Sequence, residues 1–393
     1  MQKSKISFRV VILGVVSLLN DIASEMIYPI VPIFLISVLG APALIVGLIE
    51  GLADAISKIL MAFSGVMSDR SQKRKPFVVW GYSLATISHL IMSISYTWPV
   101  VLFARVIHRT GKGIRTSARD ALITENAEKQ QRGRNFGFHR TMDSLGAVVG
   151  PLLSILLLKL LHDNYRQLFL IAFIPALVGV LLILFFIKEE KKKPLGVNGL
   201  KFEWAKTNAS YKIFLLISFI FAIGNSSNVF MILRAQNLGL SLGLTLFTYV
   251  LFNTTMSLFS LPAGILADKI GARKILFIGF LLFAFVYLSF GYIDSSGWIW
   301  VLFPIYGIFM ALTDGVSNTY ISKLVPHEIS ASAFGIYQTL MGVATFLAST
   351  IAGALWTLVS VRSPFYFGGV MALIAAFLFL ILTKRVTEVQ PVA

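Results

Sequence analysis

The sequence predicts an all-α membrane protein with twelve transmembrane helices in two pseudo-symmetric six-helix halves. Hydrophobic residues make up 56% of the 393 residues, above the roughly 45–50% apolar share of a soluble domain. Charged residues make up only 13%, and the mean hydropathy is +0.81, so most of the chain cannot face water. Two sequence motifs also recur with an offset of 198 or 199 residues, which indicates that one half repeats the other.

Apolar runs long enough to cross a bilayer define the twelve helices in order. One long polar connection follows the sixth run, so we expect an N-terminal half (1–187), a cytoplasmic linker (188–212) and a C-terminal half (213–393). The expected helices cover 8–39, 42–67, 76–96, 98–122, 134–161, 167–187, 213–236, 243–267, 275–293, 297–321, 333–358 and 363–383.

The positions of the cations predict the orientation in the membrane. With both termini cytoplasmic, 25 of the 34 Lys and Arg residues fall in cytoplasmic loops and helix ends, as the positive-inside rule requires. Four lie outside and five lie at membrane depth, the latter being Lys58, Arg105, Arg109, Lys112 and Arg140. We therefore expect a multi-pass protein of the inner (cytoplasmic) membrane. The net charge of +16 then reflects loops that face anionic lipid.

The same composition narrows the expected partners. We expect contacts with membrane lipid and a small-molecule substrate, no nucleic acid, and a monomer. The chain has no cysteine, so disulfides, thiolate metal sites and cysteine nucleophiles are excluded. No catalytic residue and no resident metal is predicted, and the chain is expected not to be an enzyme, since a nucleophile–base pair at helical spacing and a soluble catalytic domain are both missing.

Two motifs carry the repeat. The segment that begins at Gly65 and contains Asp69-Arg70 returns at Gly264 with Asp268-Lys269, an offset of 199 residues. The segment 136–141 returns as 334–339, an offset of 198 residues. Parallel six-helix repeats are typical of transporters whose substrate site lies between the halves, near the bilayer midplane.

With these motifs the chain resembles the major facilitator superfamily over essentially its whole length. The loop signature of that family is present in both halves, although Gln72 replaces its central glycine in the first copy. In the family this loop forms a cytoplasmic latch, which implies a gate made by Gly65, Asp69, Arg70, Arg74, Gly264, Asp268, Lys269 and Arg273. The glycines, four residues before each aspartate, are expected to allow close helix approach.

The fifth expected helix is similar to the antiporter motif of the same superfamily. Gly137, Gly146, Gly150 and Pro151 have the family's spacing, while Ser154 and Ile155 replace its final glycine pair. The first expected helix, with Asp21, Glu25 and the proline-containing segment 29–32, is similar to that of proton-driven exporters. Arg105 stands near the position of their proton-transfer arginine, although the residues after Gly111 depart from the exporter pattern.

Charged residues inside the membrane are costly, so they are the candidates for function. Asp21 and Glu25 lie four residues apart on one helix face, where burial and like charge favour the protonated form of at least one of them. They are the first candidates for proton coupling, together with Arg105 and Asp143. The alternative is structural, because the five acids and five bases of the first half nearly balance and can simply pair.

The second half is nearly neutral at the same depth, which suggests that the first half couples to ions and the second supplies hydrogen bonds to substrate. The Asn and Ser side chains can also merely join helices. The candidate substrate ligands are Arg109, Lys112, His139 and Arg140 in the first half and Asn225, Asn228, Asn253, Asp314, Asn318, Tyr337 and Gln338 in the second.

The resemblance implies a secondary transporter that works by alternating access, with a proton as the coupling ion and no other cofactor. The helix 134–161 glycines and the acids of 8–39 favour export of a small organic solute by proton antiport. The alternative is proton- or sodium-coupled uptake of an anionic solute, recognised by Arg105, Arg109, Lys112 and Arg140. Divalent-metal transport along His108, His139 and the two acids is a more remote alternative.

Overall fold

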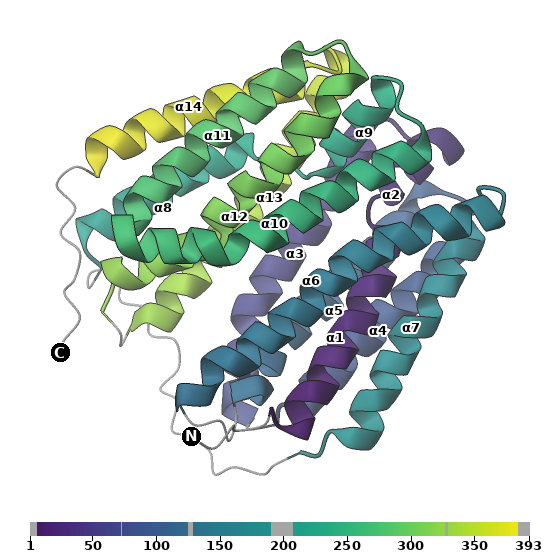
Figure 1. Cartoon of the computed structure of the whole chain (residues 1–393), viewed down its shortest axis with the longest axis vertical. Helices are drawn as coiled ribbons and strands as arrows, with labels where there is room; N and C mark the ends of the chain where they lie inside the picture. Colours follow the sequence, from purple (N-terminus) through teal and green to yellow (C-terminus); the bar gives the residue numbers. More distant parts are fainter. Residues whose placement is uncertain (1–5, 72, 125–128, 190–206, 327–328, 384–393) are drawn as a thin grey trace. The chain divides into compact units, whose positions relative to one another are not determined.

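The computed structural model describes residues 6–71, 73–124, 129–189, 207–326 and 329–383. Within these ranges all regular structure is helical (Figure 1). Every expected membrane helix is matched by one helical segment or by two or three consecutive ones, so the predicted fold class is confirmed. Nine helical segments of this described part have the length and hydropathy of membrane spans. Those below the threshold include the charge-bearing helices 43–71 and 98–124.

The first six spans are built from eight helical segments. They are α1 (Phe8–Ile27), α2 (Val31–Ile33), the π-helix η1 (Phe34–Val38), α3 (Ala43–Ser71), α4 (Lys75–Ser93), α5 (Trp98–Thr124), α6 (Lys129–Leu160) and α7 (Tyr165–Phe186). The second six are α8 (Ala209–Gly224), α9 (Val229–Asn237), α10 (Leu242–Ile270), α11 (Ala272–Tyr292), the short η3 (Ser296–Trp298), α12 (Ile299–Leu324), α13 (Ser330–Leu358) and α14 (Ser363–Leu382).

Two expected helices are interrupted, which corrects the continuous spans 8–39 and 213–236. The first breaks between α1 and α2, around Pro29, which has no N–H to donate to the preceding turn. The second breaks between α8 and α9 across 225–228, where four Asn and Ser residues, both types that favour turns, follow Gly224. The turn 28–30 lies 198 residues before 226–228, so the two breaks occupy equivalent places in the two repeats.

Residue contacts divide the chain into two compact units. The N-terminal unit comprises Met1–Gly40 with Ile56–Gly199, and the C-terminal unit comprises Ala41–Ala55 with Leu200–Ala393. The start of α3 thus packs with the second unit, where Gly353 of α13 lies against Ala43 and Leu44. The predicted domain boundaries at 187 and 213 follow the sequence repeat and stay a prediction.

Inside each unit the corresponding helices pack in the same register. In the N-terminal unit α1 packs along α6 and α4 packs along α5, and in the C-terminal unit α11 packs along α12 (Figure 1). A Cβ on Gly81 of α4 would meet Arg115 of α5, and a Cβ on Gly279 of α11 would meet Thr313 of α12. Each residue of the second pair stands 198 positions after its counterpart, so the structure extends the repeat to these helices.

Candidate functional site

The two acids of α1 lie on the face that packs against α6. Asp21 and Glu25 are both half-buried. A Cβ built on Gly146 would lie 2.7 Å from the Asp21 Cβ, and one built on Gly150 would lie 2.9 Å from the Glu25 Cβ. A side chain on either glycine would force the two helices apart, so two glycines of the antiporter-like motif let α6 approach α1 at the two carboxylates.

The rest of that motif behaves differently. Ser154, in place of the family's glycine, donates a hydrogen bond of 2.8 Å from its Oγ to the Met26 carbonyl oxygen and so ties α6 to α1. Gly137 has no described atom within 4 Å of a Cβ built on it. Gly146 and Gly150 therefore pack closely against α1, whereas Gly137, the first glycine of the motif, does not.

Asp21 stands at the centre of a charge cluster in the N-terminal unit. It interacts electrostatically with Glu25, Asp143, Lys112 and Arg115, which come from α1, α6 and α5. The amide Nδ2 of Asn20 also donates to its carboxylate at 3.2 Å, through Oδ1. Of the 98–122 cations predicted at membrane depth, Lys112 therefore interacts with the two acids of α1.

A second set of contacts joins Asp143 to the same region. The Nδ1 atom of His139 lies 3.4 Å from Oδ2 of Asp143, one turn along α6. Ser17 of α1 shares a hydrogen bond with Asp143 and accepts another, of 3.3 Å, from Nη1 of Arg119. His139 is thus a buried partner of an acid, while the neighbouring Arg140 is exposed.

The cations of α5 do not form one stripe. The guanidinium carbons of Arg105 and Arg109 lie 5.5 and 5.6 Å from the ring centre of Tyr28, within the range of a cation–π contact. Lys112 and Arg115 instead approach Asp21. The α5 cations therefore serve two places: the break after α1 and the acid cluster.

In the C-terminal unit the break between α8 and α9 is held by tyrosines. The Tyr306 hydroxyl donates to Oδ1 of Asn228 at 2.7 Å. The Tyr287 hydroxyl donates to the Ser226 carbonyl oxygen at 3.3 Å. Of the predicted ligands on this side, Asn228 is thus occupied by a hydrogen bond inside the unit, and Asn225 ends α8 as its C-cap.

The remaining predicted ligands of this unit lie on three helices. Tyr337 of α13 is hydrogen-bonded to Ser317 of α12 and interacts electrostatically with Asp314. Asp314 and Asn318 are exposed, Gln338 is half-buried, and Asn253 of α10 is buried. The structure brings Asp314 and Tyr337 together.

The predicted gate residues differ between the two copies of the loop motif. A Cβ on Gly65 would lie 3.3 Å from Ser117 of α5, whereas a Cβ on Gly264 has no described atom within 4 Å. Gly65 thus lies close to α5 in its own unit, Gly264 has no such close neighbour among the described residues, and the gate role of both glycines stays a prediction. Asp268 and Lys269 are exposed, as is Arg70.

The arginines of the gate make intra-unit bonds. Nη1 of Arg74 donates to Ser68 Oγ at 2.7 Å, and Nε of Arg273 donates to Thr383 Oγ1 at 2.8 Å, at the end of α14. The side chain of Asp69 lies outside the described residues, so its predicted latch role stays a prediction.

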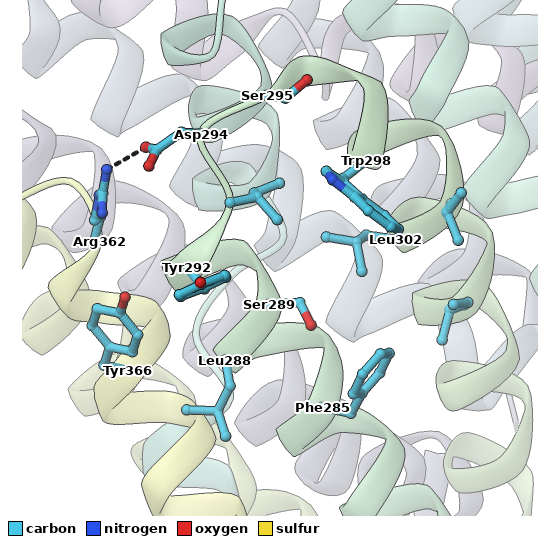
Figure 2. Close-up of a pocket in the computed structure, with 13 residues that line it drawn as sticks. Phe285, Leu288, Ser289, Tyr292, Asp294, Ser295, Trp298, Leu302, Arg362 and Tyr366 are labelled. Atoms are coloured by element: carbon cyan, nitrogen blue, oxygen red, sulfur yellow. Dashed lines mark hydrogen bonds and ion pairs between the residues drawn. The ribbon is translucent and has the colours of Figure 1, made fainter.

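The large pocket of the C-terminal unit is not made of the predicted ligands. It has a volume of about 920 Å³, and it opens where α11, η3 and α12 meet the start of α14. Figure 2 shows Tyr292, Trp298 and Tyr366 around it and an ion pair between Arg362 and Asp294 beside it. Most of its lining is apolar, and Tyr292 and Trp298 are largely exposed, which fits helices that face lipid.

Several polar residues of these sites are not predicted from the sequence. Tyr28, Tyr287 and Tyr306 look like packing residues in apolar runs, and His89 is a lone histidine. Arg115 lies among the cations predicted at cytoplasmic helix ends, yet it is buried, with its guanidinium carbon 4.3 Å from the ring centre of Tyr82. The available signal was the repeat itself, which aligns His89 and His108 with Tyr287 and Tyr306.

Comparisons with known proteins agree with this architecture. The family model described as Major Facilitator Superfamily matches residues 13–215 and 213–392. The chain is 39% identical over 386 residues to the uncharacterized MFS-type transporter MJ1317 of Methanocaldococcus jannaschii, covering 96% of this chain and 95% of that protein.

Two further matches are more distant. Multidrug resistance protein MdtH of Escherichia coli O139:H28 is 31% identical over 133 residues, or 34% of this chain and 33% of MdtH. The crystal structure of a D-xylose-proton symporter superposes with a TM-score of 0.77 at 17% identity, over 98% of this chain and 99% of that one. Sequence and fold together establish that this chain is a multi-pass membrane transporter of the major facilitator superfamily.

Proposed function

We propose that this transporter exports a small organic solute across the cytoplasmic membrane in exchange for protons. The observation that carries the proposal is the contact of Gly146 and Gly150 with α1 at Asp21 and Glu25. Two carboxylates packed at the α1–α6 interface, within electrostatic reach of Lys112 and Arg115, form a group whose pairing changes when a proton binds. The partial similarity to MdtH, named as a multidrug resistance protein, supports export.

In this proposal the acids of α1 alternate between two states. When charged they pair with the α5 cations, and when protonated they release them. A protein that favours a different conformation in each state converts a proton gradient into directed movement of solute, because the proton binds the two conformations with different affinity. Arg105, beside Tyr28, and Asp143, beside His139, are the groups that adjust this pairing.

A specific observation also favours the alternative, proton- or sodium-coupled uptake of an anionic solute. Arg105 and Arg109 lie on one ring, that of Tyr28, at the break after α1. Two guanidinium groups at an interrupted helix are suited to a carboxylate or a phosphate. Solute selectivity separates the two functions, because uptake of this kind requires an anion and export does not.

Glu25→Gln and Asp21→Asn test the proposal. A thermal-shift screen of organic anions, cations and neutral metabolites first identifies a solute that stabilises the purified protein. In proteoliposomes, each variant is expected to exchange that solute down its own gradient but to lose accumulation driven by a pH gradient. Asp163→Asn, in the exposed turn after α6, is the matched control and is expected to pump like the parent.

A structural role of the acids predicts another result. Removing one partner of a buried pair costs about 3–5 kcal/mol, so the variants would then be poorly folded as well as inactive. If both variants fold and still accumulate solute against a gradient as the parent does, proton coupling through α1 is wrong, and His139, Asp143 or Asp314 become the candidates.

A further inference from the structure

Two buried histidines of the N-terminal unit have polar atoms without a described partner. His89 of α4 and His108 of α5 are 2% and 5% exposed, and their ring centres lie 5.5 Å apart. Nε2 of His89 and both ring nitrogens of His108 are buried with no hydrogen-bond partner among the described residues. An unmet polar atom inside a protein is costly, so such atoms call for a ligand.

A small cavity lies beside these nitrogens. Its volume is about 10 Å³, which is about the minimum for one water molecule. Its polar lining includes Ser24, Ser88 and Arg105 as well as the two histidines. The Ser24 and Ser88 hydroxyls donate to the carbonyl oxygens of Asp21 and Ala85, which leaves their oxygen lone pairs to accept.

In the second repeat, two tyrosines occupy the positions equivalent to these histidines. Tyr287 and Tyr306 stand 198 residues after His89 and His108, and their ring centres lie 6.3 Å apart with an interplanar angle of 35°, against 42° for the histidines. Their hydroxyls reach the helix break at Ser226 and Asn228. An imidazole is shorter than a phenol, so the histidine pair lacks the two hydroxyl groups that close the tyrosine site.

We propose that the His89–His108 site binds a water molecule that takes the place of these tyrosine hydroxyls beside the break after α1. Water fits the lining because it accepts from an imidazole N–H and donates to the oxygens of Ser24 and Ser88. A chloride ion is larger than a water molecule, and the cavity of about 10 Å³ is already at the minimum for one water, so water is the ligand that the site holds. The break after α8 is thus closed by fixed side chains, and the break after α1 by an exchangeable ligand.

Exchangeability has a consequence for motion. A tyrosine hydroxyl stays attached to its helix, whereas a water can leave while a break opens. The break after α1 is therefore the freer of the two, next to Arg105 and Tyr28. This inference concerns the N-terminal unit alone and does not depend on the direction of transport.

His108→Tyr and His108→Phe form the test pair, since they differ only by the hydroxyl that the second repeat carries. The Tyr variant is expected to unfold at or above the temperature of the parent, with its hydroxyl in place of the water. The Phe variant is expected to unfold about 2–4 °C lower, because polar groups of the site lose their partner. If the Phe variant is as stable as the Tyr variant, or more stable, the site holds no water and the proposal is overturned.

Two measurements keep the proposal testable if either variant fails to fold. High-resolution density of the parent should show a peak within hydrogen-bond distance of His89 Nε2 and His108, and continuous apolar packing there would contradict the proposal. Replacing sodium chloride by sodium gluconate should leave the unfolding temperature of the parent unchanged. A chloride-dependent shift that the His108→Tyr variant loses would assign the site to an anion instead.

Hydrogen–deuterium exchange tests the motional consequence directly. Peptides that span 24–35 are expected to take up deuterium more slowly in the His108→Tyr variant than in the parent, while peptides that span 222–233 should be unaffected. Equal or faster uptake at 24–35 in the variant would contradict the role of an exchangeable ligand at this break.

Discussion

Glycine, rather than charge, determines how the acids of α1 meet α6. A Cβ on Gly150 would lie 2.8 Å from the carbonyl oxygen of Ile22 and 3.0 Å from the amide nitrogen of Met26, both of which are backbone atoms that cannot move aside. A Cβ on Gly146 would likewise lie 3.0 Å from a backbone atom, the carbonyl oxygen of Leu18. The environment of Asp21 and Glu25 is therefore fixed by the distance between two backbones.

Gly150→Ala should consequently damage the protein more than an alanine normally does in a helix. We expect a loss of about 1–3 kcal/mol from overpacking, together with weaker proton coupling as α6 is pushed away from Glu25. Gly137→Ala is the matched control on the same helix, where a Cβ meets open space, and it should be neutral or stabilising by up to about 1 kcal/mol. Unfolding temperatures of the two variants decide the matter, and equal values would refute the close-approach role.

The tyrosines of the second unit permit another single-residue prediction. Tyr306→Phe removes the 2.7 Å bond to Asn228 and should cost about 1–3 kcal/mol, because the amide oxygen loses its donor. Tyr292→Phe is the control, since Tyr292 is 78% exposed and should change stability little. A Tyr306→Phe variant as stable as the control would show that this bond does not hold the break.

Among whole elements, the N-terminus of α4 is capped from a distant segment. Both carboxylate oxygens of Glu189 accept hydrogen bonds of 2.9 Å, from the backbone N–H groups of Arg74 and Lys75. Lys75 Nζ in turn donates to the Leu184 carbonyl oxygen of α7 at 3.0 Å. The end of α7 and the start of α4 therefore form one corner of the N-terminal unit, whose acid also complements the helix dipole.

Glu189→Ala tests that corner. The variant should lose about 0.5–2 kcal/mol, the usual value of an N-cap, and Glu189→Asp should recover part of it if the shorter carboxylate still reaches. Limited proteolysis near this corner and the unfolding temperature are the readouts. An alanine variant with unchanged stability and unchanged proteolysis would show that Glu189 does not stabilise the start of α4.

The elements themselves were largely predictable, because an apolar run of membrane length has few alternatives to a helix. The predicted 98–122 and 363–383 differ from α5 and α14 by at most two residues at either end. The breaks were not predicted, since hydropathy averages over the polar segment 225–228 and over Pro29. In both cases a turn signal was present within the run.

The site was predictable where charge marked it and unpredictable where it did not. Asp21, Glu25, Asp143 and Lys112 were identified from charge alone, and the structure gathers them. Tyr28, Tyr287 and Tyr306 were missed because an aromatic residue in an apolar helix usually serves packing, and only a fold shows that its ring or hydroxyl meets a polar group. The roles of all these residues in transport stay predictions.

At the scale of the whole molecule, one architecture occurs twice with different chemistry. The N-terminal unit carries a cluster of mostly half-buried charges around Asp21, and the C-terminal unit carries tyrosines that hydrogen-bond at the break between α8 and α9. Duplication followed by such divergence agrees with the proposed division between ion coupling in one half and solute binding in the other.

The topology gives a prediction for the whole chain. Because the protein has no cysteine, single cysteines can report sidedness without background. Lys192→Cys and Val392→Cys should resist an impermeant thiol reagent in intact cells, whereas Asp163→Cys, in the turn after α6, should react. Labelling at Lys192→Cys or Val392→Cys in intact cells would overturn the orientation that the positive-inside rule predicts.

Proton movement coupled to solute movement tests the central claim most directly. The protein is reconstituted into vesicles that contain a trapped pH-sensitive dye, and a stabilising solute is added outside with no pH gradient imposed. Antiport predicts that entry of solute drives protons out, so the interior becomes more alkaline, and that Glu25→Gln abolishes this change. Acidification of the interior, or solute entry with no change in internal pH in the parent protein, would contradict proton antiport.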